Sequence, residues 1–241
     1  MPVDPGQLLH PCQDPGSGLR RFRQSQSIHQ AFQDLLVFFV FGLQSGNQGV
    51  CAPVLFRETL DNAGYTHTES ILNEWNYIEG FFDEPFRRSV ETIIGQKGAA
   101  FSAAFMCEGQ NSPVDMLMYY DARPSFYNGL FDFYTLRPLK GYYAFSMFND
   151  LYRFGTQVKA SSEDDEIYTV CAKDDSGNHA AYVVYFTNRA DAEAKTVSFD
   201  ADGTFDVYVL DETHNNEKTG TLSLPGTLTM QPNTVLLLKN A

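Results

Sequence analysis

The alternation of segment types between residues 57 and 157 constrains this chain more than any other feature of its sequence. Two short apolar segments, 68–76 and 114–120, each end in polar residues, and each is followed by residues with helical spacing. A strand–helix–strand–helix order is typical of α/β folds with parallel strands. A complete eight-stranded α/β barrel takes about 250 residues, so this stretch has room for roughly two of its eight units.

The helices that we expect have clear ends. A first helix ends at Gly64, and a later one starts near Pro85 and is closed by Gly98, because glycine is common just past a helix end. Further helices are expected at 99–107 and 138–154. After residue 157 the pattern changes to short strands, which we expect at 167–172, 180–187, 195–199, 205–211, 220–224 and 234–238. Turn residues at 174–178 and 200–203 predict hairpins, and together these strands predict an antiparallel β-sandwich.

The distribution of charge also divides the chain into parts. The 17 basic and 30 acidic residues give a net charge of −13, which argues against nucleic acid and against an anionic membrane as partners. Residues 1–56 contain no Lys or Glu and carry no net charge, so the whole −13 falls in 57–241. We therefore expect three parts: an atypical segment 1–56, an α/β region 57–157 and a sandwich 158–241.

The segment 1–56 contains a short apolar stretch, 35–43, behind a cluster of arginines. This stretch is too short to cross a bilayer, which takes about 20 residues, and no small-residue cleavage site follows it. The cysteines Cys12, Cys51, Cys107 and Cys171 lack the spacing of a metal site or a redox motif. These patterns favour a cytoplasmic location over export.

Asn73-Glu74-Trp75-Asn76 is the motif that carries chemistry, since it ends an apolar strand and holds the only tryptophan. In α/β barrels the catalytic side chains stand at the carboxyl ends of strands. An ionised carboxylate held by amide groups, with an aromatic face for a sugar ring, suits glycoside cleavage. The alternative is that Trp75 packs one domain onto the next while Glu74 lies in a surface turn.

Residues 68–77, TESILNEWNY, are followed by a helix, a second strand, a helix rich in Tyr, Phe and Asn, and the sandwich. This order resembles the C-terminal part of clan A retaining glycoside hydrolases, and most closely family 39, the β-xylosidase and α-L-iduronidase group. The resemblance implies the end of a TIM-type (β/α)8 barrel, with strands seven and eight in 57–157, followed by the sandwich. It makes Glu74 the candidate nucleophile, with Trp75 and Asn76 beside the substrate.

The second strand supplies further candidates. Tyr119, Tyr120 and Asp121 end it, where enzymes of this clan often place an aromatic platform under the sugar. The aromatic residues of the next loop are expected either to contact substrate or to fill core between loop and sandwich. The clan also needs an acid/base carboxylate in an Asn-Glu pair. The only other such pair, Asn216-Glu217, falls in a turn of the sandwich, so we expect the acid/base to be absent from this chain.

Three hypotheses follow. The chain is the end of a retaining glycosidase, weakly active or inactive alone, or a non-catalytic β-sandwich module that binds carbohydrate or a partner chain, or a truncated product without independent function. No cofactor and no metal are expected. The expected partner is a saccharide or glycoside substrate. Two parallel strands would leave an apolar face uncovered, so association with the rest of a barrel or with a second copy is expected as well.

Overall fold

The computed structural model describes residues 57–240, and the predicted apolar stretch and arginine cluster of residues 1–56 lie outside that range. The chain divides into two compact units, 1–68 and 69–241. In the first unit residues 57–62 are helical, and Gly64 follows at a φ of +89°. The amide of Tyr65 donates to the carbonyl of Leu60 at 2.9 Å, which closes the helix as the glycine predicts.

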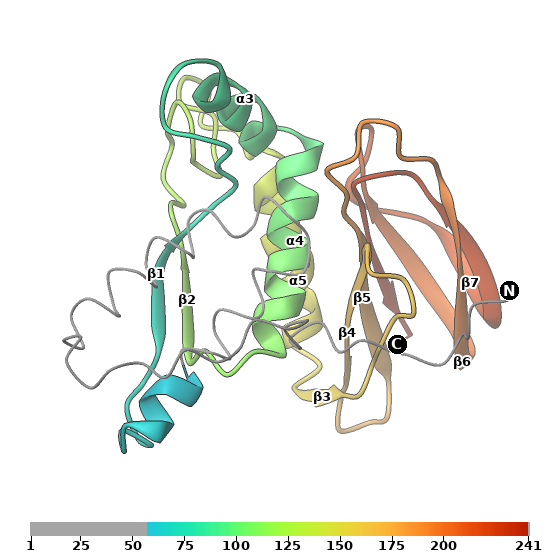
Figure 1. Cartoon of the computed structure of the whole chain (residues 1–241). Coiled ribbons are helices and arrows are strands. Elements are labelled where there is room, and N and C mark those ends of the chain that lie inside the picture. Colours follow the sequence, from blue (N-terminus) through green and yellow to red (C-terminus); the bar gives the residue numbers. More distant parts are fainter. Residues whose placement is uncertain (1–56, 241) are drawn as a thin grey trace, which may run out of the picture. The chain divides into compact units, whose positions relative to one another are not determined.

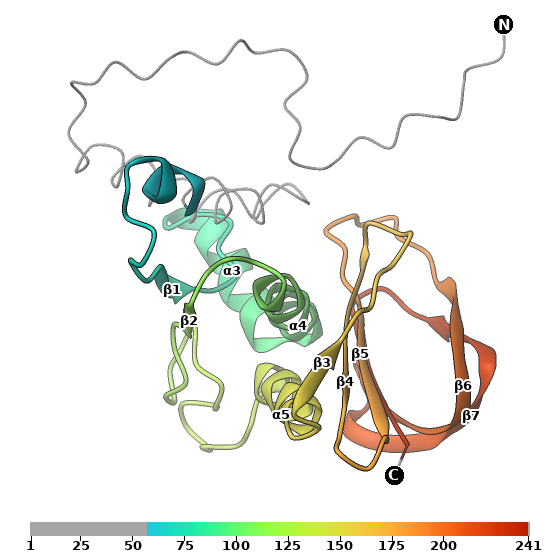
Figure 2. The same cartoon turned by 90° about the horizontal axis from the view of Figure 1, so that it is seen from below.

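The second unit begins with the expected strand–helix–strand–helix order. Strand β1 (Ile71–Trp75) is followed by helices α3 (Asp83–Ile94) and α4 (Gln96–Gln110), then by β2 (Met116–Tyr119) and α5 (Lys140–Tyr152). Strands β1 and β2 pair in parallel, as the sequence pattern predicts. Figures 1 and 2 show α4 and α5 side by side between this strand pair and a large antiparallel sheet.

The two parallel strands are more exposed than predicted. Leu117 and Tyr119 point to the helix layer, whereas Ile71, Met116 and Met118 lie on the other face and are 49%, 45% and 46% exposed. The apolar run in each segment predicts a strand that is buried, but only one face of the pair is covered. No other strand or helix of 69–240 covers the second face of this two-stranded sheet. This agrees with the expectation that two parallel strands would leave an apolar face uncovered.

Helix α3 ends earlier than predicted. Its last residue is Ile94, Gly95 follows with extended backbone, and Gly98 lies inside α4 instead of closing α3. A Cβ at position 98 would stand 2.4 Å from the carbonyl oxygen of Thr92. The glycine is therefore needed for the close approach of the two helices and not for a helix end.

The remaining strands form one six-stranded antiparallel sheet in the order β3-β4-β5-β8-β6-β7. These strands are β3 (Thr156–Val158), β4 (Ile167–Lys173), β5 (His179–Tyr185), β6 (Lys195–Leu210), β7 (Asn215–Met230) and β8 (Thr234–Lys239). The expected antiparallel architecture is confirmed, but the strands belong to a single sheet and not to two. Figure 2 shows how β6 and β7 curve across to face β4 and β5.

The predicted hairpin turn at 200–203 is wrong. Strand β6 continues through these residues, and the pairing with β7 shifts between Phe199 and Gly203. Opposite the shift lies Pro225, which has no N–H to donate to the ladder, and Gly203 has a φ of +115°. A β-bulge absorbs the extra residues, as bulges in long strands do. The predicted turn after Asp174 is confirmed, since its carboxylate accepts hydrogen bonds from the amides of Ser176 and Asn178.

The sheet has an apolar core on each face. Between its curved halves lie Ile167, Val183, Tyr185, Phe205, Val207, Met230, Leu236 and Leu238. On the other face the buried hydroxyl of Tyr182 donates to the carbonyl of Ala144 in α5 at 3.0 Å, and Phe148 meets the Tyr182 ring edge-on. The helix layer therefore packs against both the parallel strands and the sheet, which fixes the carboxyl ends of β1 and β2.

Candidate active site at the carboxyl ends of β1 and β2

The candidate site residues lie at one edge of the parallel pair. Parallel strands end at the same edge, and the amide of Tyr120 donates to the carbonyl of Trp75 at 3.1 Å, which ties the two ends together. In Figure 1 both strands lead upward into the loops beside α3. The structure thus brings the Glu74 and Tyr120 segments next to each other, as the sequence predicted.

Glu74 lies at an irregularity of β1. Leu72 pairs with Leu117 and Trp75 with Tyr119, so β1 has one more residue than β2 between these pairs. This β-bulge allows both Asn73 and Glu74 to be exposed while Leu72 and Trp75 face the helices. Bulges of this kind re-aim a side chain and are frequent next to active sites. The Glu74 carboxylate is accordingly on the open face, beyond the helix layer.

Trp75 lies in the core. Its side chain is 6% exposed, its ring stacks on Phe105 of α4 with centroids 4.3 Å apart, and Tyr119 meets it edge-on at 5.0 Å. The indole therefore packs against α4 instead of offering an open face to a sugar, which corrects the expected role of this residue. The bulge is the reason, because it rotates Trp75 to the helix side. The indole N–H is buried and has no hydrogen-bond partner.

Asn76 holds the strand ends together. Its Nδ2 donates to the carbonyl of Tyr120 at 2.8 Å and to that of Asn128 at 3.4 Å, while its Oδ1 accepts the amide of Tyr77 at 2.7 Å. Both ends of the amide are thus used within the protein. Asn76 positions the site and leaves little hydrogen-bonding capacity for a ligand.

Asn128 is a site residue that the sequence analysis missed. It is 1% exposed, its Oδ1 accepts the Ser125 hydroxyl at 2.7 Å, and its carbonyl accepts the amide of Asp121 at 3.2 Å and the Tyr119 hydroxyl at 3.3 Å. An asparagine in a loop carries no sequence signal for such a role. It fastens the loop that follows β2 to the ends of both strands.

Tyr119, Tyr120 and Asp121 differ in what they offer. Tyr119 is half-buried against Trp75, and burial raises its pKa to about 12. Tyr120 is 38% exposed, and Asp121 forms an ion pair with Arg123 at 2.7 Å through one oxygen. The other oxygen of Asp121, Oδ1, is buried without a hydrogen-bond partner. Of the three, Tyr120 therefore has the most surface for a ligand, whereas one oxygen of Asp121 is paired with Arg123 and the other is buried.

A second polar cluster follows β1. The buried hydroxyl of Tyr77 donates to Glu79 at 3.0 Å and to Asn188 at 3.1 Å, and Arg88 donates to Glu79 at 2.8 Å. Burial and the neighbouring Glu79 carboxylate raise the pKa of Tyr77. This cluster joins the loop after β1 to α3 and to the loop after β5, which holds the Glu74 segment in place. The sequence analysis did not find it.

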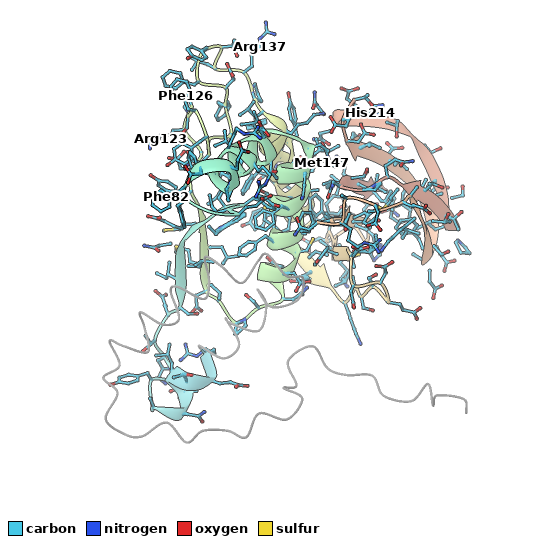
Figure 3. All side chains as sticks on the ribbon, turned by 45° about the horizontal axis from the view of Figure 1, so that its top comes forward. Phe82, Arg123, Phe126, Arg137, Met147 and His214 are labelled. Atoms are coloured by element: carbon cyan, nitrogen blue, oxygen red, sulfur yellow. The ribbon has the colours of Figure 1, made fainter. Side chains whose placement is uncertain are left out.

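The loop 122–137 exposes much of its aromatic content. Phe126, Phe133 and Tyr134 are 60%, 45% and 76% exposed, whereas Tyr127 packs against Phe86 of α3. Tyr127 therefore fills core against α3 and not against the sheet, and contact of the exposed rings with substrate stays a prediction. Figure 3 shows Phe126 and Arg137 on this loop.

Metal sites, thiols and membrane-spanning helices were the other features to consider in the described part of the chain. Within residues 57–240, no three His, Cys, Asp or Glu side chains gather as metal ligands would, and Cys107 and Cys171 are free thiols. None of the helices in this range is both long enough and apolar enough to span a membrane.

No family model matches the chain, and no curated protein matches it. Solved structures do. A glucosidase from Croceicoccus marinus aligns with a TM-score of 0.54 at 18% identity, over 78% of this chain and 49% of its own. A GH30 endoxylanase from Clostridium papyrosolvens aligns with a TM-score of 0.54 at 11% identity, over 76% of this chain and 45% of its own. An arabinofuranosidase aligns with a TM-score of 0.52 at 15% identity, over 77% of this chain and 46% of its own.

These neighbours are glycoside hydrolases, and this chain spans about half the length of each. At such identities the likeness is one of fold. The two parallel strands, the helix layer and the antiparallel sheet of this chain thus form an arrangement shared with part of glycoside hydrolase structures.

Proposed function

We propose that this chain is part of a retaining glycoside hydrolase that cleaves O-glycosidic bonds of β-xyloside-like substrates, with Glu74 as its nucleophile. One observation carries the proposal. A bulge at the carboxyl end of β1 exposes a glutamate, in a chain whose fold is shared with glycoside hydrolases. The family 39 likeness of the Glu74-Trp75-Asn76 motif supports the assignment of the nucleophile.

The chemistry follows from an ionised carboxylate on an open face. An oxygen of Glu74 attacks the anomeric carbon, the bond to the leaving-group oxygen breaks, and that oxygen takes the electron pair. Water then hydrolyses the glycosyl-enzyme. A retaining enzyme needs a second carboxyl group about 5 Å away as acid/base, and the sequence contains no candidate for it.

The other candidate residues take supporting roles in this proposal. Trp75 and Asn76 position Glu74, Trp75 by packing on α4 and Asn76 by joining the strand ends. Tyr120 and Asp121 contact the sugar.

The test uses a substrate that needs no acid catalyst. The leaving group of 2,4-dinitrophenyl 2-deoxy-2-fluoro-β-xyloside departs without a proton, and the fluorine slows hydrolysis of the intermediate. We expect slow, single labelling of the 1–241 chain, seen as one added fluoroxylosyl group in the intact mass and found on Glu74 by peptide mapping. Glu74→Gln should stay unlabelled. Labelling of another carboxylate, or none, would contradict the proposal.

The same proposal predicts weak turnover. An ordinary aryl β-xyloside needs protonation of its leaving group, so we expect little or no hydrolysis by 1–241 alone. Robust turnover that Glu74→Gln abolishes would show that the chain supplies its own acid/base. Saccharide binding by the 1–241 chain without any labelling of Glu74 would favour the non-catalytic module instead.

A further inference from the structure

Three exposed aromatic rings form a compact cluster on the loop 122–137. Phe126 and Phe133 stack with their centroids 4.2 Å apart and an interplanar angle of 24°, and Tyr134 meets each of them edge-on. We call Phe126, Phe133 and Tyr134 the aromatic platform. Large aromatic side chains that are mutually packed yet exposed mark an interaction site on a surface.

The platform is held rigid by the backbone around it. One oxygen of Asp132 accepts the amide and the hydroxyl of Thr135, both at 2.7 Å, and the amide of Tyr134 at 3.2 Å. These hydrogen bonds lower the pKa of Asp132, so it is charged at neutral pH. The amide of Asp132 also donates to the carbonyl of Arg137 at 2.8 Å, which closes the loop on itself. The rings are thus presented in a preformed arrangement.

The same loop has an inner side that anchors it. Leu130 is 7% exposed, and Asn128 is buried and hydrogen-bonded to the strand ends. Because these residues face inward, the opposite side of the loop is exposed, and the aromatic platform lies there together with Leu136 and Arg137. The loop leaves β2 at Asp121, so the platform belongs to the same edge of the parallel pair as Glu74. In Figure 3 Phe126 and Arg123 lie on this side of the unit.

We infer that the aromatic platform binds a neutral, β-linked pyranose chain and so extends the substrate site at Glu74, an inference that rests on the proposed function. The axial C–H groups of a β-linked pyranose carry slight positive charge, and they complement the negative face of an aromatic ring. A net charge of −13 disfavours an anionic chain. Of the two arginines of this loop, Arg123 is already paired with Asp121, and Arg137 lies at the other end.

The experiment separates binding from catalysis. In the Glu74→Gln background no substrate is consumed, and binding is measured by calorimetry with xylohexaose and by retardation in gels that contain soluble xylan. We expect the double variant Phe126→Ala/Phe133→Ala to bind xylohexaose at least tenfold more weakly, which is about 1.4 kcal/mol. Tyr134→Ala should weaken binding to a smaller extent.

The matched control is Tyr152→Ala. Tyr152 is as exposed as Tyr134, at 76%, but it lies at the far end of α5. We expect its affinity to stay within twofold of the parent, and unchanged Trp75 fluorescence in every variant to show that the fold is intact.

Several results would overturn the inference. These are an unchanged affinity in the double variant, an equal loss in Tyr152→Ala, or no binding of xylohexaose by the parent. Self-association that only the double variant abolishes, without saccharide binding, would assign the platform to a protein contact. Failure of labelling at Glu74 with binding retained would refute the nucleophile and leave the platform in place.

Discussion

Trp75 shows how a single extra residue in a strand decides which way a side chain points, and so what role it has. From its place after Glu74 it was expected to face the sugar, yet the extra residue in β1 turns it onto Phe105 and Tyr119. Sequence spacing cannot reveal a bulge, because the side-chain alternation of a strand is broken only when the strand pairs. Glu74 could be proposed from the sequence because its chemistry and its position at a strand end are both visible there, and its role stays a prediction.

Replacing Trp75 should therefore cost stability before it affects any binding. We expect Trp75→Ala to lower the free energy of unfolding by about 3 to 5 kcal/mol, the range for large buried aromatic residues. Trp75→Phe keeps a ring against Phe105 and removes the unpartnered N–H, so its cost should be about 1 to 2 kcal/mol. Urea unfolding followed by circular dichroism measures both.

The exposed neighbour provides the control for this comparison. Glu74→Gln should change the free energy of unfolding by less than about 0.5 kcal/mol. A Trp75→Ala variant as stable as Glu74→Gln would mean that the indole is not part of the core.

At the scale of elements, the junction of α3 and α4 depends on a missing side chain. A Cβ at Gly98 would stand 2.4 Å from the Thr92 oxygen and 2.7 Å from the Ile93 Cα. Sequence analysis read this glycine as a helix end, because glycine after a helical pattern usually has that role. Only the packing of one helix on the next shows that it allows a close approach.

We expect Gly98→Ala to destabilise the protein by about 1 to 3 kcal/mol, although alanine in a helix interior is normally favoured by about 1 kcal/mol. Thermal unfolding would show a lower Tm. Gly220→Ala in β7 is the control, since a Cβ there meets nothing within 4 Å. A higher Tm for Gly98→Ala would contradict the close packing of the two helices.

A salt-bridge cluster joins β6 to the residues before β4. Lys195 lies 2.7 Å from Asp164 and 2.8 Å from Glu166, and Thr187 donates to Glu166 at 2.6 Å. Burial pushes the pKa of each carboxyl upward, but the hydrogen bonds and the charge of Lys195 outweigh it, so both pKa values lie below their ordinary 3.8 and 4.5. Stability from these groups is present above about pH 4.5 and is lost as the pH falls through the lowered values.

Lys195→Met should therefore be less stable than the wild type at pH 7, and the difference should shrink between pH 5 and pH 3. The raised pKa of Lys195 itself matters only above about pH 10.5, so it leaves this window unaffected. Urea unfolding at several pH values tests this. Lys218→Met removes a single exposed pair with Asp206 and should leave the free energy of unfolding nearly unchanged at every pH. If the difference in stability between Lys195→Met and the wild type stayed constant from pH 7 to pH 3, the two carboxyl groups would not be the source of the pH dependence.

At the scale of the whole unit 69–240, side chains form hydrogen bonds between the helix layer and the sheet. The buried Tyr182 hydroxyl reaches the Ala144 carbonyl in α5, and Gln96 of α4 donates to the carbonyls of Leu210 at 3.0 Å and Asn233 at 2.6 Å. The boundary that we propose between 157 and 158 falls inside β3, the first strand of the sheet, and these contacts cross it as well. We expect the parts on either side to unfold together.

Trp75 provides the probe, because it is the only tryptophan and lies on the helix side of the parallel strands. Its fluorescence and the circular dichroism of the sheet should give the same urea midpoint. Tyr182→Phe removes the hydrogen bond to the Ala144 carbonyl, which keeps its partner within α5, and should lower both midpoints equally, by the equivalent of about 1 kcal/mol in the free energy of unfolding. Tyr152→Phe, at an exposed position, should lower neither. Two separate midpoints would establish 158–241 as an independent domain.

The sequence by itself determined the order of the elements, the parallel pair, the antiparallel character of residues 158–240 and the place of Glu74 at a strand end. These features depend on local periodicity, on turn residues and on the number of residues available. Only the tertiary structure decided which face of each strand is covered, that Trp75 is core, that the six strands form one curved sheet and that Asn128 joins the strand ends. Those outcomes depend on pairing register and on contacts between residues far apart in the chain, which no local pattern encodes.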